Sequence, residues 1–305
     1  MSELEIAVQG VLAEPAGAAG RPARSYWRES AERLWANRLA VACAVYVALL
    51  ALSALSAPLI SRFLTHYSPT DQDLTNLFQP PGGAHLLGTD ELGRDTLTRL
   101  VYGAQVSLTV GFLTAALSLV VGGTVGMVAG YRGGWLDNAL MRLVDIILSI
   151  PAIFLFILLS TLLRPNAVTL SFIIAFVGWG NVSRLVRAEA LSLRSREFVL
   201  ATRSIGAGAI RVMLRHLLPN ALPVMIVAAS LAVGQIILAE SALSFLGLGI
   251  QPPTPSWGNM LSLSQQYYYH SAWLVVFPGA MIFLAVLAAS LLGNAIRDAF
   301  DPRLR

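Results

Sequence analysis

Seven arginines gather in one polar stretch of the sequence, residues 184–220, which lies between two long apolar runs. They are Arg184, Arg187, Arg194, Arg196, Arg203, Arg211 and Arg215. A segment this basic cannot lie in hydrocarbon, and the positive-inside rule places it on the cytoplasmic side of a membrane. Cationic groups on such a loop suit docking and the transfer of force. We predict no catalytic residue and no metal site in the chain.

The pattern inside this stretch predicts two helices joined by a glycine turn. Leu191 to Ser204 alternates arginine with apolar residues as an amphipathic helix does, and Gly206 and Gly208 then interrupt it. Glycine at those points permits a positive φ or the close approach of another backbone. Residues 209–218 suit a second short helix with Arg211 and Arg215 on one face. A bent unit of this kind could transmit motion from a docked partner.

Two acidic residues fall inside apolar runs, where an ionisable group is a functional candidate by default. Asp145 has Arg142 three residues before it, and we favour a local ion pair between them. Glu240 has no charged neighbour along the chain. It must be protonated, bonded to another helix, or exposed to a watery path. Two roles stay open for it, together with Ser241 and Ser244: an external gate or path lining, and an interhelical hydrogen bond.

Composition limits the class of protein. Of 305 residues 56% are hydrophobic and only 12% are charged, against about a quarter in soluble domains, so we predict a polytopic membrane protein. Every base is arginine, and without lysine there is no Walker A motif to hold nucleotide phosphates. Energy must therefore come from a partner or an ion gradient. The single cysteine, Cys43, excludes an internal disulfide and suits helix packing.

The chain divides into a disordered tail (1–24), an interfacial helix with the first span (25–61), a polar segment (62–99), a core (100–297) and a tail (298–305). The six predicted spans are Leu39–Ser61, most of Leu100–Tyr131, Leu143–Leu163 with a kink at Pro151, Ala167–Val182, Pro219–Leu246 and Ala272–Ile296. A cleaved signal peptide is the alternative for the first, but its apolar run is too long. Gly122, Gly126 and Gly130 predict a smooth face for close helix packing. This topology puts 17 of 21 arginines and both termini in the cytoplasm.

Two polar or irregular segments are predicted outside the membrane. Residues 62–99 are acidic and contain the string GTDELGRD, ahead of a helix that Thr89 or Asp90 would cap. The motif residues are Gly88, Thr89, Asp90, Glu91, Gly93, Arg94 and Asp95. Residues 247–271 are rich in proline and tyrosine and read as an external loop, partly re-entrant.

Four strings carry a resemblance to a known family. LATRSIGAGAIRVMLRHLLP resembles the EAA loop of ABC importer permeases at Ala201, Gly206, Leu218 and Pro219, and departs from it at Leu200, Thr202 and His216. GTDELGRD, AESALSFLGLGIQPPTPSWGNML and IRDAFDPRLR resemble the C-type permease subunits of dipeptide and oligopeptide ABC importers. The resemblance covers nearly the whole chain from Arg33 onward.

The resemblance implies an all-α type I ABC importer permease in the cell membrane, with six spans and a cytoplasmic coupling helix. The implied partners are a homologous B-type permease, two ATP-binding subunits that hold ATP and Mg, and an extracellular peptide-binding protein; this chain would bind no cofactor. The implied ATPase-coupling residues are Arg203, Ser204, Ile205, Gly206, Ala207, Gly208, Ala209, Ile210, Arg211, Val212, Met213 and Arg215. Alternatives are a nickel or small-solute importer of the same family, a secondary carrier, and an assembly subunit.

Overall fold

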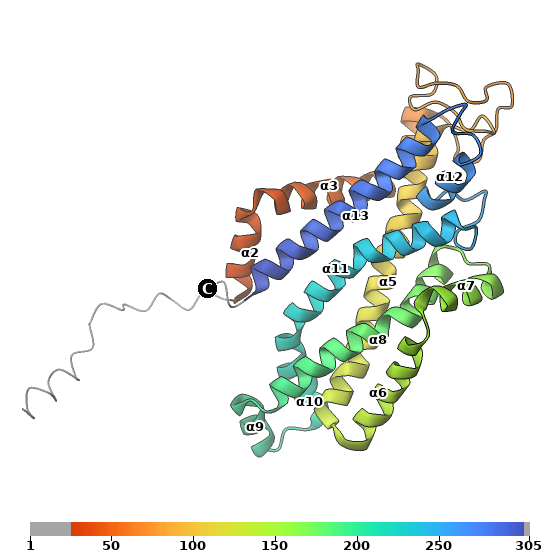
Figure 1. The fold of residues 1–305 in the computed structure, drawn as a ribbon. Coiled ribbons are helices and arrows are strands. Elements are labelled where there is room, and N and C mark those ends of the chain that lie inside the picture. Colours follow the sequence, from red (N-terminus) through yellow and green to blue (C-terminus); the bar gives the residue numbers. More distant parts are fainter. Residues whose placement is uncertain (1–25, 302–305) are drawn as a thin grey trace, which may run out of the picture.

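The fold is a bundle of long helices, seen in a computed structural model that describes residues 26–301 (Figure 1). The predicted tail 1–24 and residues 302–305 lie outside the described residues. The helices are α2 (Tyr26–Ala36), α3 (Arg38–Leu55), α4 (Ala57–Ile60), α5 (Thr96–Arg132), α6 (Gly134–Ser149), α7 (Ala152–Leu163), α8 (Ala167–Arg194), α9 (Glu197–Ser204), α10 (Ala209–Val212), α11 (Leu218–Phe245), α12 (Trp257–Ser264) and α13 (Trp273–Phe300). Single π-helical turns follow α4 (Ser61–Thr65) and α10 (Met213–Leu217).

Five helical runs in the described residues are long and apolar enough to cross a membrane, and the pair α6 and α7 brings the number to six if it is one span. The prediction of six spans is therefore met if α6 and α7 are counted as one span. The predicted kink at Pro151 is too mild, because α6 and α7 are bent by 83°. Ile150 and Pro151 both have extended backbone, which stops the helix. Proline disfavours helical geometry in the residue before it and lacks an N–H.

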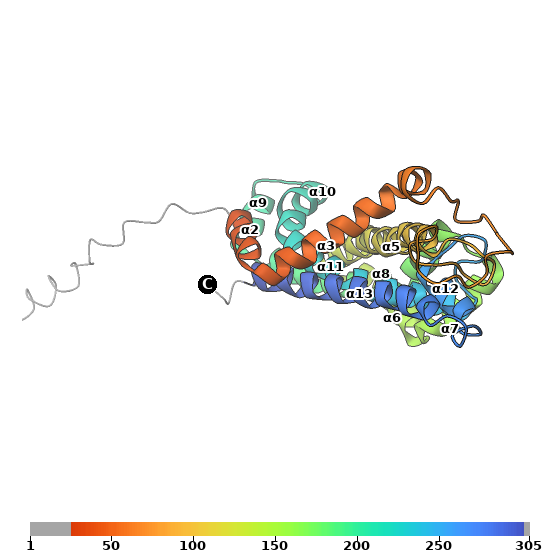
Figure 2. The same ribbon diagram turned by 90° about the horizontal axis from the view of Figure 1, so that it is seen from above.

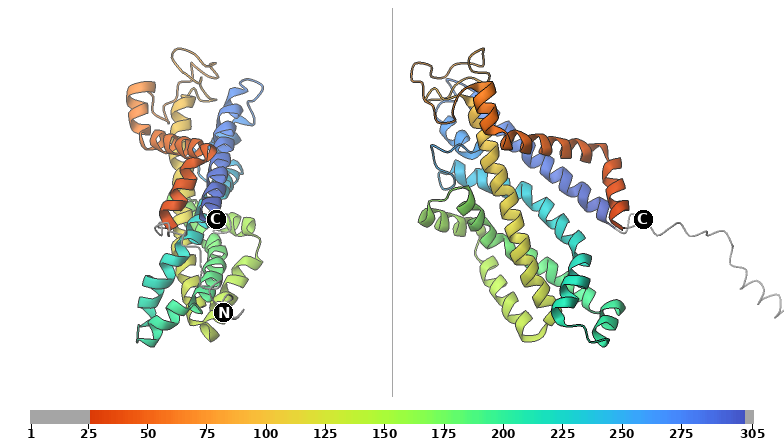
Figure 3. Two further views of the ribbon diagram at one scale, coloured as in Figure 1. Left: turned by 90° about the vertical axis from the view of Figure 1, so that its left-hand side faces the viewer. Right: turned by 180° about the vertical axis from the view of Figure 1, so that it is seen from behind.

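The longest contact in the bundle joins α5 to α8, which run side by side (Figure 3). The predicted glycine face lies in this contact. A Cβ at Gly122 would be 2.4 Å from the carbonyl oxygen of Trp179, and one at Gly126 would be 2.3 Å from that of Ser183. Both distances are far below van der Waals contact, so the close packing of the two backbones requires glycine. The prediction of a smooth packing face is confirmed.

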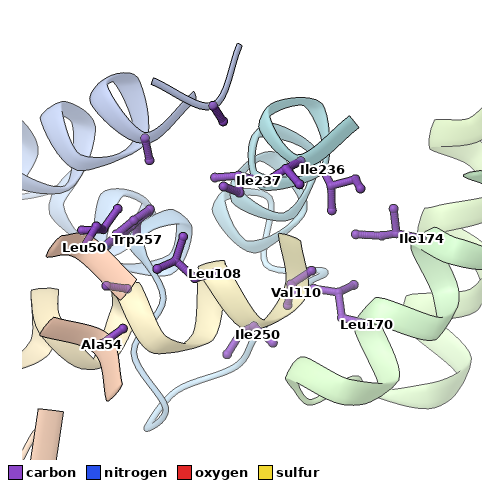
Figure 4. Packing of buried hydrophobic residues seen from close by; sticks show 14 of the residues in the cluster. Leu50, Ala54, Leu108, Val110, Leu170, Ile174, Ile236, Ile237, Ile250 and Trp257 are labelled. Atoms are coloured by element: carbon purple, nitrogen blue, oxygen red, sulfur yellow. The ribbon is translucent and has the colours of Figure 1, made fainter. Parts of the chain in front are cut away.

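A second region of close packing holds α3, α5, α8, α11 and α12 together (Figure 4). Trp257 is fully buried at its centre, and its indole N–H donates to the carbonyl oxygen of Leu100 at 3.0 Å. The proline-rich segment after α11, predicted as a loop, therefore carries a short helix that is part of the core. A Ser256–Asn259 capping box starts that helix.

The bundle has two distinct ends. Residues 66–95 and α12 lie at one, named here the loop end, and α9 and α10 lie at the other, named the arginine end (Figure 1). The view from above shows α3 beside α13, with α2 near the end of α13 (Figure 2). The first predicted span is not one helix, because α3 stops at Leu55 and Pro58 opens α4. The last helix runs past the predicted Ile296 to Phe300.

Candidate coupling and transport site

The arginine-rich stretch folds as two helices around a glycine turn, at boundaries that differ from the prediction. The fourth span does not stop at Val182, since α8 continues to Arg194, and the chain breaks at Ser195 before α9. Gly206 has φ +85°, a left-handed conformation that favours glycine. Gly208 has φ −67°, and a Cβ there would meet no atom within 4 Å, so another residue could occupy this position. Gly206 alone supplies the turn.

A buried apolar cluster fixes this segment to the bundle. Val199 of α9, Val212 of α10 and Leu217 are completely buried, and they share a cluster with Met127 of α5 and Val186 of α8. The second short helix does not end at Leu218, because the π-helical turn leads into α11 with helical backbone throughout. A displacement of α10 must therefore be passed to α11.

The arginines of the stretch split into two groups. Arg187 binds the Asp137 carboxylate with two hydrogen bonds of 2.5 and 2.7 Å, and Arg194 donates to the carbonyl oxygens of Gly130 and Tyr131 at the end of α5. These hold the bundle together. Arg184 pairs with Asp145 at 2.6 Å, so the local pair expected with Arg142 is wrong. The pairing crosses from α8 to α6 and could not be read from spacing along one helix.

The second group faces outward. Arg211 and Arg215 are exposed and line, with Gly206 and His216, a cavity of about 280 Å³ at the arginine end. Three apolar side chains beside them are strongly exposed, Ile205 at 85%, Ile210 at 70% and Leu214 at 60%. We name these five residues, Ile205, Ile210, Arg211, Leu214 and Arg215, the coupling face. Leu214 was not among the predicted coupling residues, although it lies one helical turn after Ile210. Ile210 and Leu214 lie on the side of the segment that lines a cavity with α5, and Arg211 and Arg215 lie on the other side. Exposed apolar side chains together with arginines are typical of a protein interaction surface.

The GTDELGRD string forms a compact loop at the loop end, named here the motif loop, and hydrogen bonds among its own residues hold it together. Asp90 accepts hydrogen bonds from the backbone N–H and Nε of Arg94, and Glu91 binds Arg94 Nη2 at 2.6 Å. Burial, and next the neighbouring Asp90 carboxylate, raise the pKa of Glu91. Thr89 Oγ1 donates to the carbonyl oxygen of Asn76, and Asp95 accepts from the backbone N–H of Thr98. Asp95 is therefore the cap of α5, in place of the predicted Thr89 or Asp90.

The motif loop requires glycine at position 93. Gly93 has φ +70°, and a Cβ there would lie 1.9 Å from the carbonyl oxygen of Asp73. We expect Gly93→Ala to release segment 66–95 from the end of α5, which limited proteolysis would detect as cleavage much faster than in the unchanged protein. Gly83→Ala, where a Cβ meets no atom within 4 Å, is the matched control and should leave the cleavage rate unchanged. Equal rates in both variants would contradict this role.

Glu240 lies inside the bundle and is fully buried. Its carboxylate accepts hydrogen bonds at 2.8 Å from Ser107 of α5 and from Ser244 of α11, and a longer one of 3.4 Å from Ser241. Ser244 Oγ also accepts from the backbone N–H of Ile250, so the network reaches the segment before α12. The geometry is that of the interhelical hydrogen bond. A gating role for Glu240, Ser241 and Ser244 stays a prediction.

Two cavities that the sequence analysis missed lie along α8 and α11. One, of about 350 Å³, is an open cavity lined by α5, α7, α8 and α11 and named here the middle cavity. The other, of about 790 Å³, lies toward the arginine end between α8, α11, α2 and α13 and is named the vestibule. Asn181 and Gln235, which line the middle cavity, interrupt apolar runs. A polar residue within an apolar span was the sequence signal that could have indicated the middle cavity.

Comparisons with known proteins show which family this chain resembles. A family model described as "Binding-protein-dependent transport system inner membrane component" matches residues 122–305, and one described as "N-terminal TM domain of oligopeptide transport permease C" matches residues 25–81. A dipeptide transport system permease protein DppC of Alkalihalophilus pseudofirmus is 41% identical over 281 residues, covering 92% of this chain and 91% of its own. The oligopeptide transport system permease protein OppC of Bacillus subtilis is 36% identical with the same coverage.

The fold has a solved counterpart. A chain from an inward-facing structure of the MetNI methionine ABC transporter superposes with a TM-score of 0.52 at 21% identity, covering 67% of this chain and 97% of its own. The resemblance stated from the four sequence strings is confirmed by these matches. With a family model covering more than half of the chain and relatives similar over nine tenths of it, this multi-pass membrane protein belongs to the binding-protein-dependent transport system inner membrane components, the permease subunits of ABC importers.

Proposed function

We propose that this chain is the C-type permease subunit of an ATP-driven importer of dipeptides or oligopeptides. It would form half of the translocation path, and a homologous B-type permease would form the other half. The observation that carries the proposal is the coupling face, an exposed surface on a segment that is anchored in the core and continuous with α11. The similarity to dipeptide and oligopeptide permeases favours peptides over the nickel alternative.

The proposed mechanism is mechanical. The arginine end would lie in the cytoplasm with both termini, and two ATPase subunits would bind ATP and Mg and grip the coupling face. When the ATPases close, α10 would be displaced, and the helical join at residues 213–218 would carry that displacement into α11. Because α11 lines both the middle cavity and the vestibule, its movement would change which side of the membrane the path faces. An extracellular binding protein would deliver peptide at the loop end.

The dependence on partners can be tested by reconstitution. We expect this chain alone in proteoliposomes to import no labelled dialanine or trialanine. Import should appear only when a B-type permease, two ATPases, the binding protein and ATP are all present. A secondary carrier would import peptide without ATPases, driven by an ion gradient, so uptake by the isolated chain would contradict the proposal.

The coupling turn offers a second test with a close control. Gly206→Ala forces an L residue into the left-handed region at a cost of about 1–2 kcal/mol. We expect the complex to assemble, while the ratio of peptide imported to ATP hydrolysed falls about five-fold, the equivalent of ~1 kcal/mol. Removing the exposed cation with Arg211→Ala should act in the same direction.

The control for this test is Gly208→Ala, two residues away. Its backbone is in an ordinary region and a Cβ there meets no neighbour within 4 Å, so it should keep the normal ratio. A normal ratio in Gly206→Ala and Arg211→Ala would remove this segment from the coupling mechanism.

A further inference from the structure

The middle cavity holds polar side chains that have no hydrogen-bond partner in the described part of the chain. Asn181 of α8 and Gln235 of α11 are exposed in the isolated subunit, and neither amide makes a hydrogen bond within residues 26–301. Both lie well inside helices that are long and apolar enough to span a membrane. An unpaired amide facing hydrocarbon costs several kcal/mol, so each must face water, a partner subunit or a substrate.

Ser118 of α5 adds an independent observation. It lines the same cavity and is only 6% exposed, yet its hydroxyl has no hydrogen-bond partner. A Cβ at Gly178 would lie 3.0 Å from Ser118 Oγ, so the glycine leaves room beside the hydroxyl. A buried serine in a helix normally bonds to the carbonyl oxygen one turn earlier, as Thr124 does to Val120 in the same helix. The Ser118 oxygen is itself covered and faces α8 at Gly178, so it is an unpaired hydroxyl in the wall behind the cavity.

The cavity is placed to be part of a continuous path. Leu185 of α8 and Ala228 of α11 line both the middle cavity and the vestibule, so the two spaces adjoin. The vestibule also borders the end of α13 and Asn220, near the arginine end. The volume of the middle cavity, about 350 Å³, falls within the ~300–1,000 Å³ typical of small-molecule sites.

The lining of the middle cavity carries no charged side chain. Its polar groups, Thr114, Ser118, Asn181 and Gln235, are all neutral, and its remaining lining residues are apolar or glycine. Neutral amides and hydroxyls can both donate and accept hydrogen bonds, as a peptide group does. Such a surface can bond to the backbone of a peptide while leaving its side chains to apolar walls and water.

We propose that Asn181 and Gln235 form a contact site for the peptide backbone halfway along the translocation path, with the unpaired Ser118 hydroxyl in the wall behind them. This inference rests on the proposed function and adds the residues that meet the substrate. Because this half of the lining carries no charge in the described residues, the contacts that this chain makes here would recognise the peptide backbone and not the charge of its side chains. Among the described residues of the two cavities, charged groups line the vestibule alone, and they are Glu189, Arg297 and Asp301.

The first test measures uptake in proteoliposomes that hold the complete complex. Asn181→Leu and Gln235→Leu each remove an amide at nearly constant size. We expect each to lower dialanine uptake about five-fold, the loss of one hydrogen bond of ~1 kcal/mol, with normal assembly and ATP hydrolysis. The matched control is Asn294→Leu in α13, an exposed amide that itself lines neither cavity, which should keep normal uptake. Equal uptake in all three variants would overturn the inference.

The second test uses the single cysteine of the chain. In a Cys43→Ala background, Asn181→Cys and Gln235→Cys should react with a water-soluble methanethiosulfonate in the assembled complex, and excess dialanine during turnover should slow both reactions. A lack of reaction at both positions would mean that the partner permease covers them. Reaction unaffected by peptide would mean that they face water alone. Either result overturns the inference and leaves the proposed function standing, whereas absence of ATP-dependent uptake by the unchanged complex would overturn both.

Discussion

Replacing Glu240 with alanine is expected to cause the largest loss of stability of any single polar substitution in the described bundle, about 3 kcal/mol. The substitution leaves the hydroxyls of Ser107 and Ser244 without the acceptor that each contacts at 2.8 Å, and it opens a void at a fully buried position. Because Ser107 belongs to α5 and Ser244 to α11, the contact between these helices should weaken first. Reversible unfolding in mixed detergent, titrated with SDS, measures the change in free energy of unfolding.

Two further variants make this prediction specific. Glu240→Gln keeps the shape and one carbonyl acceptor, so we expect it to lose about 1 kcal/mol. Ser241→Ala removes only the 3.4 Å contact and should cost less than either. If the alanine and glutamine variants unfold at the same SDS fraction, the hydrogen bonds of Glu240 contribute little. The gating role would then become the better explanation for a carboxylate at that depth.

The sequence was sufficient for features set by local chemistry. Long apolar runs gave the spans, because a helix of about 20 residues satisfies its own backbone in lipid. Glycine every four residues predicted a face for close helix packing, which the structure fills with α8, and Gly206 and Gly208 predicted the turn, which Gly206 supplies. Both features rest on the missing Cβ. The family resemblance, carried by four strings, was likewise readable without coordinates.

Features that depend on contacts between residues far apart in the sequence could not be predicted from it. Asp145 was assigned to Arg142 by spacing, but α8 runs past α6 and brings Arg184 to within 2.6 Å. The cap of α5 was misplaced because Thr89 and Asp90 are used instead to bind Asn76 and Arg94. The 83° bend at Pro151 was underestimated, because the backbone of both Ile150 and Pro151 leaves the helical conformation. The middle cavity is lined by four helices, so single-helix patterns could not reveal it.

The contact of α5 with α8 is expected to fail when Gly126 is replaced by valine. A Cβ at this position would lie 2.3 Å from the carbonyl oxygen of Ser183, 2.9 Å from the backbone nitrogen of Arg187 and 3.0 Å from Cβ of Val186. Two of these three atoms belong to the α8 backbone, which has no rotamer to change. The helices must therefore separate, and overpacking of this kind costs about 3 kcal/mol. We expect the pair Arg187–Asp137, which bridges α8 and α6 nearby, to be strained as well.

The matched control is Gly279→Val in α13, where a Cβ meets no atom within 4 Å. It carries the same change in helix propensity, so any difference between the two variants reports the packing clash alone. Thermal denaturation of the detergent-solubilised complex, followed by size-exclusion fluorescence, should show a clear drop in melting temperature for Gly126→Val and little for Gly279→Val. Gly126→Ala should fall between them, because its single methyl group needs a smaller separation of the helices. Equal melting temperatures for the two valine variants would mean that α5 and α8 can slide apart without loss, and the coupling segment would then lack the rigid base that force transfer requires.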